Sequence, residues 1–366
     1  MRIEPSRLDA FTARLNPVTT ASLSSSAAEP HTLSELLALA DPETRRRWDG
    51  LDLSYASSCG DPVLREAIAE LYEGVGLDGI LTFAGAQEAI FCTLASVLRP
   101  GDRVVGVTPC YEALAVVPRM LGAEVVEVPL TFAGSWRLDV DRMIGEIRPG
   151  TALVLLNFPH NPTGANLPER DLGRILTAVE SAGALLFSDE VHRLLPHGDA
   201  APNRPAADLS DRAISLDVMA KSFGLAGVRV GWLACHDREI LAQTQDAKGW
   251  TSICNSRPDE ILALIGLRAR ENILTRNRNI IRDNLAQVSS FAADQPDLLD
   301  WIPPEAGCTA FPRFKDGRDA TRYAEHLAHS AALLLLPGPL FSGPPDHVRL
   351  GLGPRTLPAG LARWSR

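Results

Sequence analysis

Short apolar runs alternate with longer amphipathic stretches through the middle of this 366-residue chain. The apolar runs lie at 80–83, 104–107, 124–128, 152–156, 184–187, 213–216 and 228–233. Helical periodicity fills gaps between them at 86–98, 112–121, 139–147 and 168–182. Because short, continuously apolar strands that alternate with helices fit burial on both faces, the pattern predicts a parallel sheet covered by helices on both sides. Ligands of such sheets bind beyond the carboxyl ends of the strands, so we expect the chemistry in the loops there.

The N-terminal part of the chain lacks this alternation. Residues 1–30 are of mixed composition with a serine- and alanine-rich piece at 22–28, which predicts a loop or arm. A short amphipathic helix is expected at 32–39. Another helix should begin with Asp61 as N-cap and Pro62 in its first turn, and continue to about Tyr72.

The C-terminal part begins with a long helical stretch at 257–293. Strands are then predicted at 308–314, 332–336 and 347–352, with a helix at 318–329. We therefore expect an α/β protein with a mostly parallel, seven-stranded sheet flanked by helices. The large domain is predicted at 46–260, and a smaller α+β domain is predicted to combine an N-terminal arm, 1–45, with 261–366.

Composition excludes several classes of function. A net charge of −9 argues against a nucleic-acid binder, which needs a basic face, although a local cationic pocket remains compatible with it. Six cysteines without C-x-x-C spacing indicate neither a zinc site nor a disulfide framework. No apolar run approaches the roughly 18 residues of a membrane helix, and no signal-peptide pattern is present. We expect a cytoplasmic protein with reduced thiols, no metal site and no membrane or nucleic-acid partner.

Lys221 is one of only three lysines in a chain with 36 lysines and arginines. Arginine stays charged at any working pH, whereas a buried lysine can lose its proton and attack a carbonyl. Arg229, eight residues later, could bind a phosphate or a carboxylate. This segment alone fits a carbonyl-binding lysine and a surface lysine at a strand-to-helix turn equally well.

Loops after four of the predicted strands carry groups that suit a ligand. Gly85 and Ala86 open a helix and leave backbone N–H groups available to an anion, as many glycine-rich turns do without a ligand. Tyr111 could stack on a planar ring or simply cover the sheet. Asn161 offers an amide, and Asp189 is either an expensive buried carboxylate or a helix N-cap. Together with Lys221 these groups describe a container for pyridoxal 5′-phosphate (PLP), a planar, phosphorylated aldehyde with a ring nitrogen.

Motifs in a fixed order carry a resemblance to a known family. They are Tyr55-x4-Gly60-Asp61-Pro62-x-Leu64-Arg65, Gly85-Ala86-Gln87, Pro109-x-Tyr111, Asn161-Pro162-Thr163-Gly164, Asp189-Glu190-Val191-His192, Ala220-Lys221-x-Phe223-Gly224, Arg229-x-Gly231 and Val348-Arg349-Leu350-Gly351. In these motifs the chain resembles the fold-type-I PLP enzymes of aminotransferase class I/II over nearly its whole length. The resemblance implies PLP as the cofactor and the large and small domains of that fold.

The resemblance also implies roles for residues around the cofactor ring. Lys221 would form the internal aldimine and then move protons on the substrate. Asp189 would pair with the protonated pyridine nitrogen, and Tyr111 would stack on the ring. Asn161 would hydrogen-bond to the ring oxygen, beside which His192 replaces the family's usual tyrosine.

Further roles follow for the phosphate and the substrate. The phosphate would be held by four residues of the same chain and one of a neighbouring subunit, which implies a homodimer with active sites at the interface. The four are Gly85, Ala86, Gln87 and Arg229, and the neighbour's residue is Tyr55. Arg349 would clamp the α-carboxylate of the substrate as a bidentate pair. Asn161 and Ser25 are also expected at the substrate.

Two reaction types are compatible with these residues. The first is transamination of an L-amino acid, with a 2-oxo acid as the second substrate. The second is elimination or replacement at Cβ, because His192 also occurs in C–S lyase relatives and 24–26 and 309–314 resemble a branch that includes capreomycidine synthase, which cyclises a hydroxylated arginine. Val218 departs from the family's usual hydroxyl residue, which removes one expected phosphate contact. A catalytically inactive relative is disfavoured, because the cofactor-binding and substrate-binding residues are present together.

Overall fold

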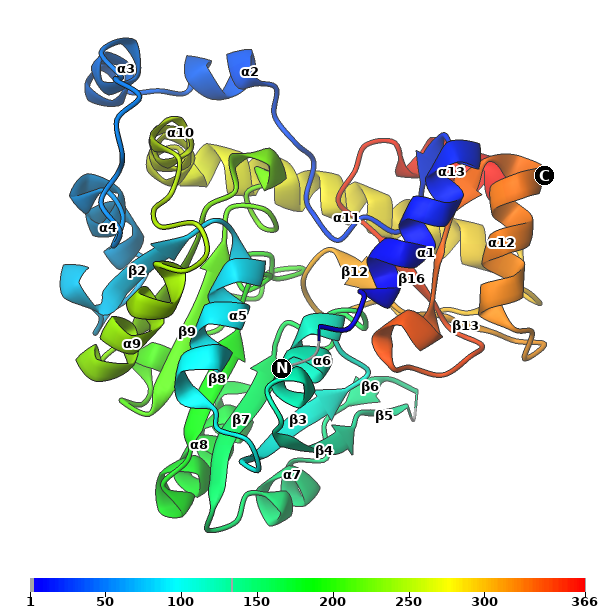
Figure 1. Ribbon diagram of the computed structural model, residues 1–366. Coiled ribbons are helices and arrows are strands. Elements are labelled where there is room, and N and C mark those ends of the chain that lie inside the picture. The colour runs from blue at the N-terminus through cyan, green and yellow to red at the C-terminus, as the bar shows by residue number, and fades with distance from the viewer. Residues whose placement is uncertain (1–2, 133, 366) are drawn as a thin grey trace.

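A seven-stranded sheet is the largest feature of the computed structural model, which describes residues 3–132 and 134–365 (Figure 1). The strand order is β2-β10-β9-β8-β7-β3-β4, which confirms the α/β class. Only the pairings of β10 with β2 and β9 are antiparallel within this sheet, so β10 runs against all the others. The strands are β2 (Ile80–Phe83), β3 (Arg103–Thr108), β4 (Glu124–Pro129), β7 (Thr151–Asn157), β8 (Leu185–Asp189), β9 (Ala213–Val218) and β10 (Gly231–Cys235).

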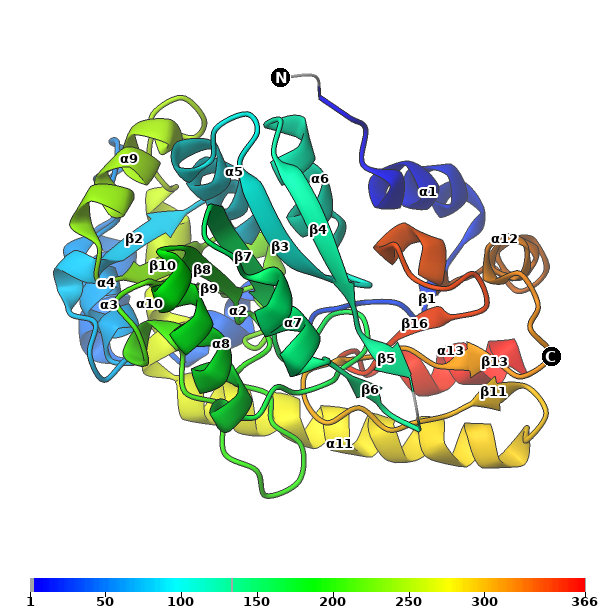
Figure 2. The ribbon, with the colours of Figure 1, turned by 90° about the horizontal axis from the view of Figure 1, so that it is seen from below.

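Helices cover both faces of this sheet, because successive strand residues point to opposite sides. Leu153 and Leu155 pack under α5, α6 and α9, whereas Val154 and Leu156 pack on the side of α7 and α8 (Figure 2). Near β2, helices α4 and α10 pack against each other. The helices are α4 (Pro62–Ala69), α5 (Ala86–Val97), α6 (Glu112–Met120), α7 (Val140–Glu146), α8 (Glu169–Ala182), α9 (Arg238–Lys248) and α10 (Arg257–Arg268).

The expectation of a loop or arm throughout 1–30 is wrong for α1 (Arg7–Leu15) and β1 (Ala21–Ser22). Ser6 caps α1 by accepting a hydrogen bond from the backbone N–H of Asp9, and Phe11 and Leu15 are buried one turn apart. Glu112 also accepts hydrogen bonds from the backbone N–H groups of Arg7 and Leu8, a contact between segments about 105 residues apart. With only two fully buried apolar side chains, the helical period of α1 is too short to detect from the sequence.

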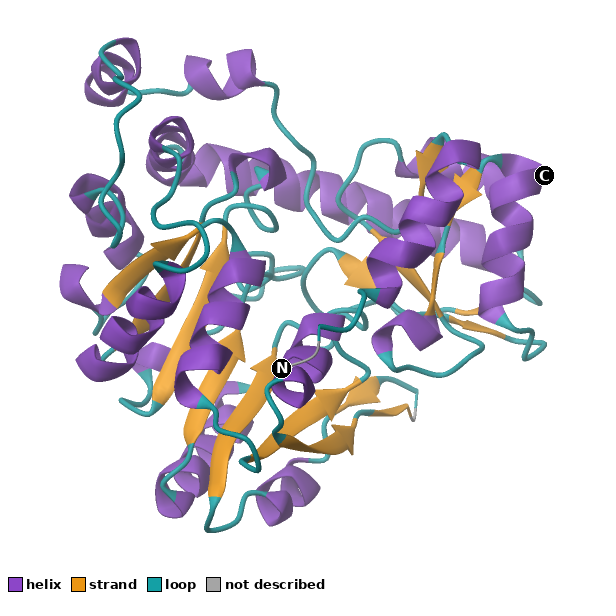
Figure 3. Ribbon diagram, in the orientation of Figure 1, coloured by secondary structure: helices purple, strands orange, loops and turns teal. Residues whose placement is uncertain are grey.

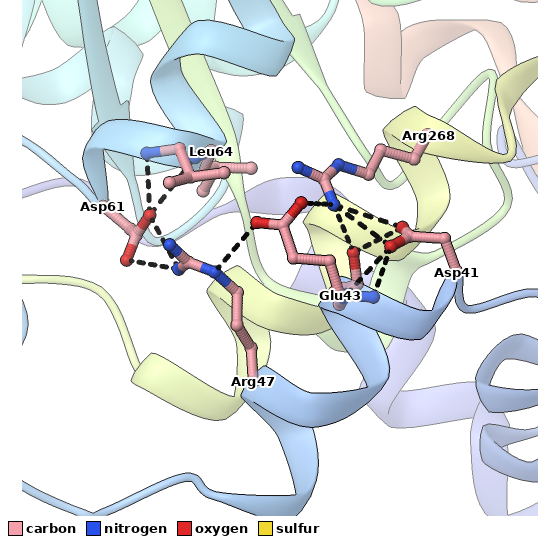
Figure 4. Close-up of polar contacts among 8 residues, drawn as sticks. Asp41, Glu43, Arg47, Asp61, Leu64 and Arg268 are labelled. Carbon is pink, nitrogen blue, oxygen red and sulfur yellow. Dashed lines mark hydrogen bonds and ion pairs between the residues drawn. The ribbon is translucent and has the colours of Figure 1, made fainter.

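Three helices follow β1: α2 (Leu33–Ala38), as expected, then α3 (Pro42–Asp49) and α4. Asp61 caps α4 as predicted, but α4 ends at Ala69 rather than near Tyr72. Ion pairs join α3 to its neighbours (Figure 4): Arg47 lies 3.4 Å from Asp61 at the start of α4, and Arg268 of α10 lies 3.2 Å from Glu43. These contacts anchor both ends of the segment 50–61, which contains Tyr55.

The C-terminal part mixes short strands with long helices (Figure 3). The predicted strand 308–314 is two strands, because Pro312 cannot donate a ladder hydrogen bond, and 332–336 is likewise divided. Helix α11 extends from beside α10 to the C-terminal helices (Figure 1). The elements are α11 (Arg270–Asp294), β11 (Leu299–Asp300), β12 (Thr309–Ala310), β13 (Arg313–Phe314), α12 (Ala320–Ala331), β14 (Leu333–Leu334), β15 (Leu336–Pro337), β16 (Val348–Gly351) and α13 (Leu357–Trp364).

Small sheets complete the fold. β12, β16 and β15 form a three-stranded sheet, and β1 pairs in parallel with β14, which attaches the N-terminal segment to the C-terminal part. A hairpin of β5 (Thr131–Phe132) and β6 (Trp136–Arg137) follows β4. We retain the domain division as a proposal; its second boundary, after residue 260, falls within α10. None of the helices in the described ranges is long and apolar enough to cross a membrane. All six cysteines are free.

Candidate active site

A cavity of about 580 Å³, counting its part open to solvent, lies at the carboxyl ends of five strands of the large sheet. The cavity lies at the edge of the sheet where a doubly covered parallel sheet is expected to bind a ligand. It is lined by Ala86, Gln87, Ile90, Tyr111, Asn157, Asn161, Asp189, Val191, Val218, Ala220, Lys221 and Arg229.

Lys221 follows β9 and points its amine at the N-terminal segment. Its Nζ donates a 2.7 Å hydrogen bond to Ser26 Oγ, and its backbone carbonyl accepts one from Ala28. Burial, followed by repulsion from Arg349, lowers the pKa of Lys221 from its ordinary 10.5 to about 8. A larger neutral fraction at physiological pH is what a nucleophilic amine requires.

Ser26 is a site residue that the sequence did not single out. The available signal was the stretch 24–26, which was part of the resemblance and from which Ser25 rather than Ser26 was predicted at the site. Gly224 explains how the stretch comes so close to the lysine: it has φ = 69°, and a Cβ there would lie 2.4 Å from the backbone oxygen of Glu29. Only glycine allows the N-terminal segment to cross the lysine loop at this distance.

Asp189 ends β8 and is only 4 % exposed. Burial raises the pKa of its carboxyl from 3.8 to about 7, against the opposing effects of a 3.3 Å hydrogen bond from Val191 N and the charge of Lys221. No arginine, lysine or histidine of the described residues lies within ion-pair distance of it. A buried carboxylate without a cation calls for a positive partner, and a protonated ring nitrogen in the cavity would supply one.

An anion cradle lies between β2 and α5. Gly85 is the N-cap of α5 at φ = 91°, and no side chain in the described part of the protein caps this helix. The Arg229 guanidinium packs directly over Gly85, where a Cβ would come within 2.3 Å of Nη2. Free helix N–H groups, the helix dipole and the guanidinium together favour an anion such as a phosphate.

Tyr111 and Asn161 line the walls between these groups. The Tyr111 hydroxyl donates to Gln87 Oε1 at 2.9 Å, which holds the phenol ring along the cavity wall. The backbone N–H of Asn161 donates to Asn157 Oδ1 at 3.0 Å, and Asn157 Nδ2 donates to the carbonyl of Asp189 at 3.0 Å. Asn157 therefore ties the loop that contains Asn161 to the strand that contains Asp189.

Arg349 on β16 is 4 % exposed and has no carboxylate within ion-pair distance among the described residues. Nη1 donates to Asn161 Oδ1 at 3.1 Å and Nη2 donates to the carbonyl of Ser24 at 2.6 Å, whereas Nε lacks a partner. Burial lowers its pKa to about 10. A buried, incompletely satisfied guanidinium is suited to bind an incoming carboxylate.

Replacing Arg349 by glutamine is expected to raise KM for α-carboxylate substrates by about 10²-fold or more, because charge-assisted hydrogen bonds contribute about 1.5–3 kcal/mol each. Steady-state kinetics with a series of L-amino acids would measure this. Arg313→Gln, which removes the more exposed arginine paired with Asp300, is the control. An unchanged KM in the Arg349 variant would exclude the carboxylate role.

Like Gly85 and Arg349, three further predicted site residues are not part of the cavity wall. His192 is buried, with Nδ1 3.6 Å from Cys308 Sγ and Nε2 without a partner among the described residues. Burial, followed by the charges of Lys221 and Arg349, holds the pKa of His192 well below its ordinary value, so its ring is neutral. Ser25 Oγ accepts from its neighbour Ala27 N, and Tyr55 is 84 % exposed. Their roles remain predictions.

The residues present fit PLP. The cradle at Gly85 and Arg229 suits its phosphate, and the unpaired carboxyl of Asp189 suits its ring nitrogen. Lys221 provides the amine for its aldehyde. The unpartnered Nε2 of the neutral His192 leaves one hydrogen-bonding group available near these residues.

Residues 34–357 match the sequence profile of the family Aminotransferase class I and II. The chain belongs to the class I and II aminotransferase family. Capreomycidine synthase of Streptomyces vinaceus is 32 % identical over 347 residues, which are 94 % of this aminotransferase-family chain and 88 % of that protein.

Solved structures agree with the family and the fold. A PLP-dependent aminotransferase from Streptococcus suis superposes with a TM-score of 0.93 at 28 % identity, covering 100 % of this chain and 97 % of that one. The PLP-dependent cyclase OrfR gives 0.89 at 31 % identity with the same coverages. The protein is thus a fold-type-I enzyme of the aminotransferase family, and its cofactor is pyridoxal 5′-phosphate.

Proposed function

We propose that this enzyme transaminates an L-amino acid, with Lys221 as the catalytic amine. The observation that carries the proposal is a cavity wall that contains a lysine with a lowered pKa and a buried carboxyl without an ion-pair partner, with the buried guanidinium of Arg349 hydrogen-bonded to Asn161 of the same wall. Bound PLP would supply an electron sink for the bonds at the substrate Cα. The chain's own residues would then decide which bond breaks and where the proton goes.

Each residue has a defined task in this proposal. Arg349, supported by Asn161, would fix the α-carboxylate and so orient the Cα–H bond. Lys221 would remove that proton and return one to the cofactor side, with Ser26 as a hydrogen-bond partner while the amine is free. Asp189 would keep the ring nitrogen protonated because its carboxylate is costly to bury alone.

The alternative is a reaction at Cβ: elimination, replacement or cyclisation. The similarity to capreomycidine synthase and to the cyclase OrfR supports it. The two reactions share the first proton removal and differ in the next step. Transamination returns the proton to the cofactor, whereas the alternative expels a group from Cβ.

A single-turnover experiment separates them. The purified enzyme with stoichiometric PLP receives one L-amino acid at a time, without a 2-oxo acid, and the cofactor is analysed by mass spectrometry. Transamination converts the cofactor to its amine form and yields one equivalent of 2-oxo acid. Release of ammonia, or of a cyclic product from a β-substituted or hydroxylated substrate, with unchanged cofactor would overturn transamination in favour of the alternative.

We also propose a homodimer in which Tyr55 reaches the cofactor phosphate of the second copy. Support comes from large apolar side chains that are exposed in two places, the anchored segment 50–61 and the loop after α9. They are Leu53 (85 % exposed), Tyr55 (84 %), Trp250 (92 %) and Ile253 (54 %). An ion pair joins the two places: Arg257, the residue that follows the loop after α9, pairs with Asp52 of the segment 50–61. Such a surface is unfavourable in water and suits an obligate interface.

A further inference from the structure

Lys248, the last residue of α9, is fully buried. Its ammonium donates three hydrogen bonds: to Ser58 O at 2.7 Å, to Thr82 O at 2.7 Å and to Asn255 Oδ1 at 2.9 Å. It also lies 5.5 Å from the ring centre of Phe83. No carboxylate of the described residues lies within ion-pair distance, so three neutral oxygens satisfy the charge. A lysine ammonium presents three donors around one point, whereas the planar fork of arginine could not fill this site.

The three acceptors belong to three separate segments: the loop that contains Tyr55, strand β2, and the loop after α9. Asn255 extends the contact, because its Nδ2 donates to the carbonyl of Phe83 at 2.7 Å. That same carbonyl accepts the N–H of Gly85 at 2.8 Å. A continuous set of hydrogen bonds therefore joins the Lys248 ammonium to the glycine of the phosphate cradle.

The loop after α9 is tied to the cradle a second time. Glu88, in the first turn of α5, accepts the N–H of Ala84 at 2.6 Å with one oxygen and the N–H of Ser252 at 3.0 Å with the other. Two ionic side chains, Lys248 and Glu88, thus link the loop after α9 to Phe83 and Ala84, the two residues before Gly85. Simple filling of the core would not need this arrangement, because an apolar side chain of equal volume fills a core without the cost of burying a charge.

We propose that Lys248 is a positioning residue for the phosphate cradle: its ammonium fixes the end of β2, and with it Gly85 and the first N–H groups of α5, in the conformation that binds the cofactor phosphate. The inference rests on the proposed placement of the phosphate at Gly85 and Arg229. It does not depend on whether the enzyme transaminates or cyclises its substrate. Through Ser58 the same ammonium holds the segment that would present Tyr55 to a second copy.

The test compares PLP with pyridoxal, which has the same ring and aldehyde but no phosphate. Lys248→Met keeps the volume and removes the donors, and Asn255→Ala removes one acceptor together with the donor to Phe83 O. Each variant and the wild type are titrated with both ligands, and binding is followed by absorbance and by quenching of tryptophan fluorescence. Lys315→Met, at a lysine whose side chain is 44 % exposed, is the matched control.

The expected result is a PLP dissociation constant about tenfold or more higher in Lys248→Met, a smaller increase in Asn255→Ala, and an unchanged constant for pyridoxal in both. Equal losses for both ligands would show a general structural role, and no loss for either would show no role; each overturns the proposal. Should Lys248→Met not fold, the Asn255 variant decides by the same criterion. A wild-type chain that binds pyridoxal as tightly as PLP would refute the phosphate cradle itself.

Discussion

Replacing Lys221 by alanine is expected to abolish the visible absorbance that PLP gives when it is covalently joined to the protein. Turnover should fall by about 10³-fold or more, because in the proposed mechanism the same residue supplies both the nucleophile and the base. The other two lysines cannot substitute. Lys248 uses all three ammonium protons on buried oxygens, and Lys315 donates to a surface carbonyl of residue 296.

An absorbance titration of wild type, Lys221→Ala and Lys315→Ala measures this effect directly. The Lys315 variant should be indistinguishable from wild type. The Lys221 variant should still bind PLP non-covalently, because Arg229 and the N-terminus of α5 remain in place. Persistence of the wild-type absorbance in Lys221→Ala would show that another group anchors the cofactor.

Replacing Asp189 by asparagine is expected to have the second largest effect, with activity reduced by about 10²-fold or more while PLP still binds. The amide keeps the shape of the carboxyl but cannot balance a positive ring nitrogen. The nitrogen would then lose its proton, and the ring would withdraw electrons less strongly. Near-normal rates in this variant would show that the ring nitrogen does not need to be charged for this reaction.

The same substitution should have the opposite effect on the stability of the cofactor-free chain. The folded pKa of Asp189, about 7, lies above its ordinary value of 3.8. Such a carboxyl contributes to stability below pH 3.8, and that contribution is lost as the pH rises to about 7. Asp189→Asn should therefore gain stability over the wild type across this interval, by up to about 4 kcal/mol at pH 8.

Thermal unfolding of the cofactor-free proteins at pH 5 and pH 8 checks this sign. Asp211→Asn, at a side chain that is 89 % exposed, is the control and should show no such pH-dependent gain. Equal melting temperatures for wild type and Asp189→Asn at pH 8 would show that the buried carboxyl already has a cationic partner in solution. A gain in stability together with a loss of activity would indicate that the carboxyl is kept for catalysis at a cost in stability.

Local patterns in the sequence were sufficient for most of the large sheet and for the residues at its strand ends. The seven runs identified the strands within a few residues. Strands buried on both faces must be continuously apolar, whereas the edge strand β4 is partly exposed and carries Glu124 and Glu127. Gly85, Asp189 and Lys221 follow directly from these runs, since each comes at or just after a strand end. Resemblance to the family added Arg349, which is far from them in the sequence.

Contacts between distant segments had no such signal. Ser26 lies 195 residues before Lys221, and Thr82 lies 166 residues before Lys248. The sequence determined which chemical groups the chain carries and which strand ends present them, because both follow from residue type and local period. Only the tertiary structure decided which serine hydrogen-bonds to the amine of Lys221 and which buried lysine holds the end of β2. Those pairings depend on how the N-terminal segment and α9 pack against the sheet, and a hydrogen bond of 2.7 Å between remote segments leaves no periodic trace in either of them.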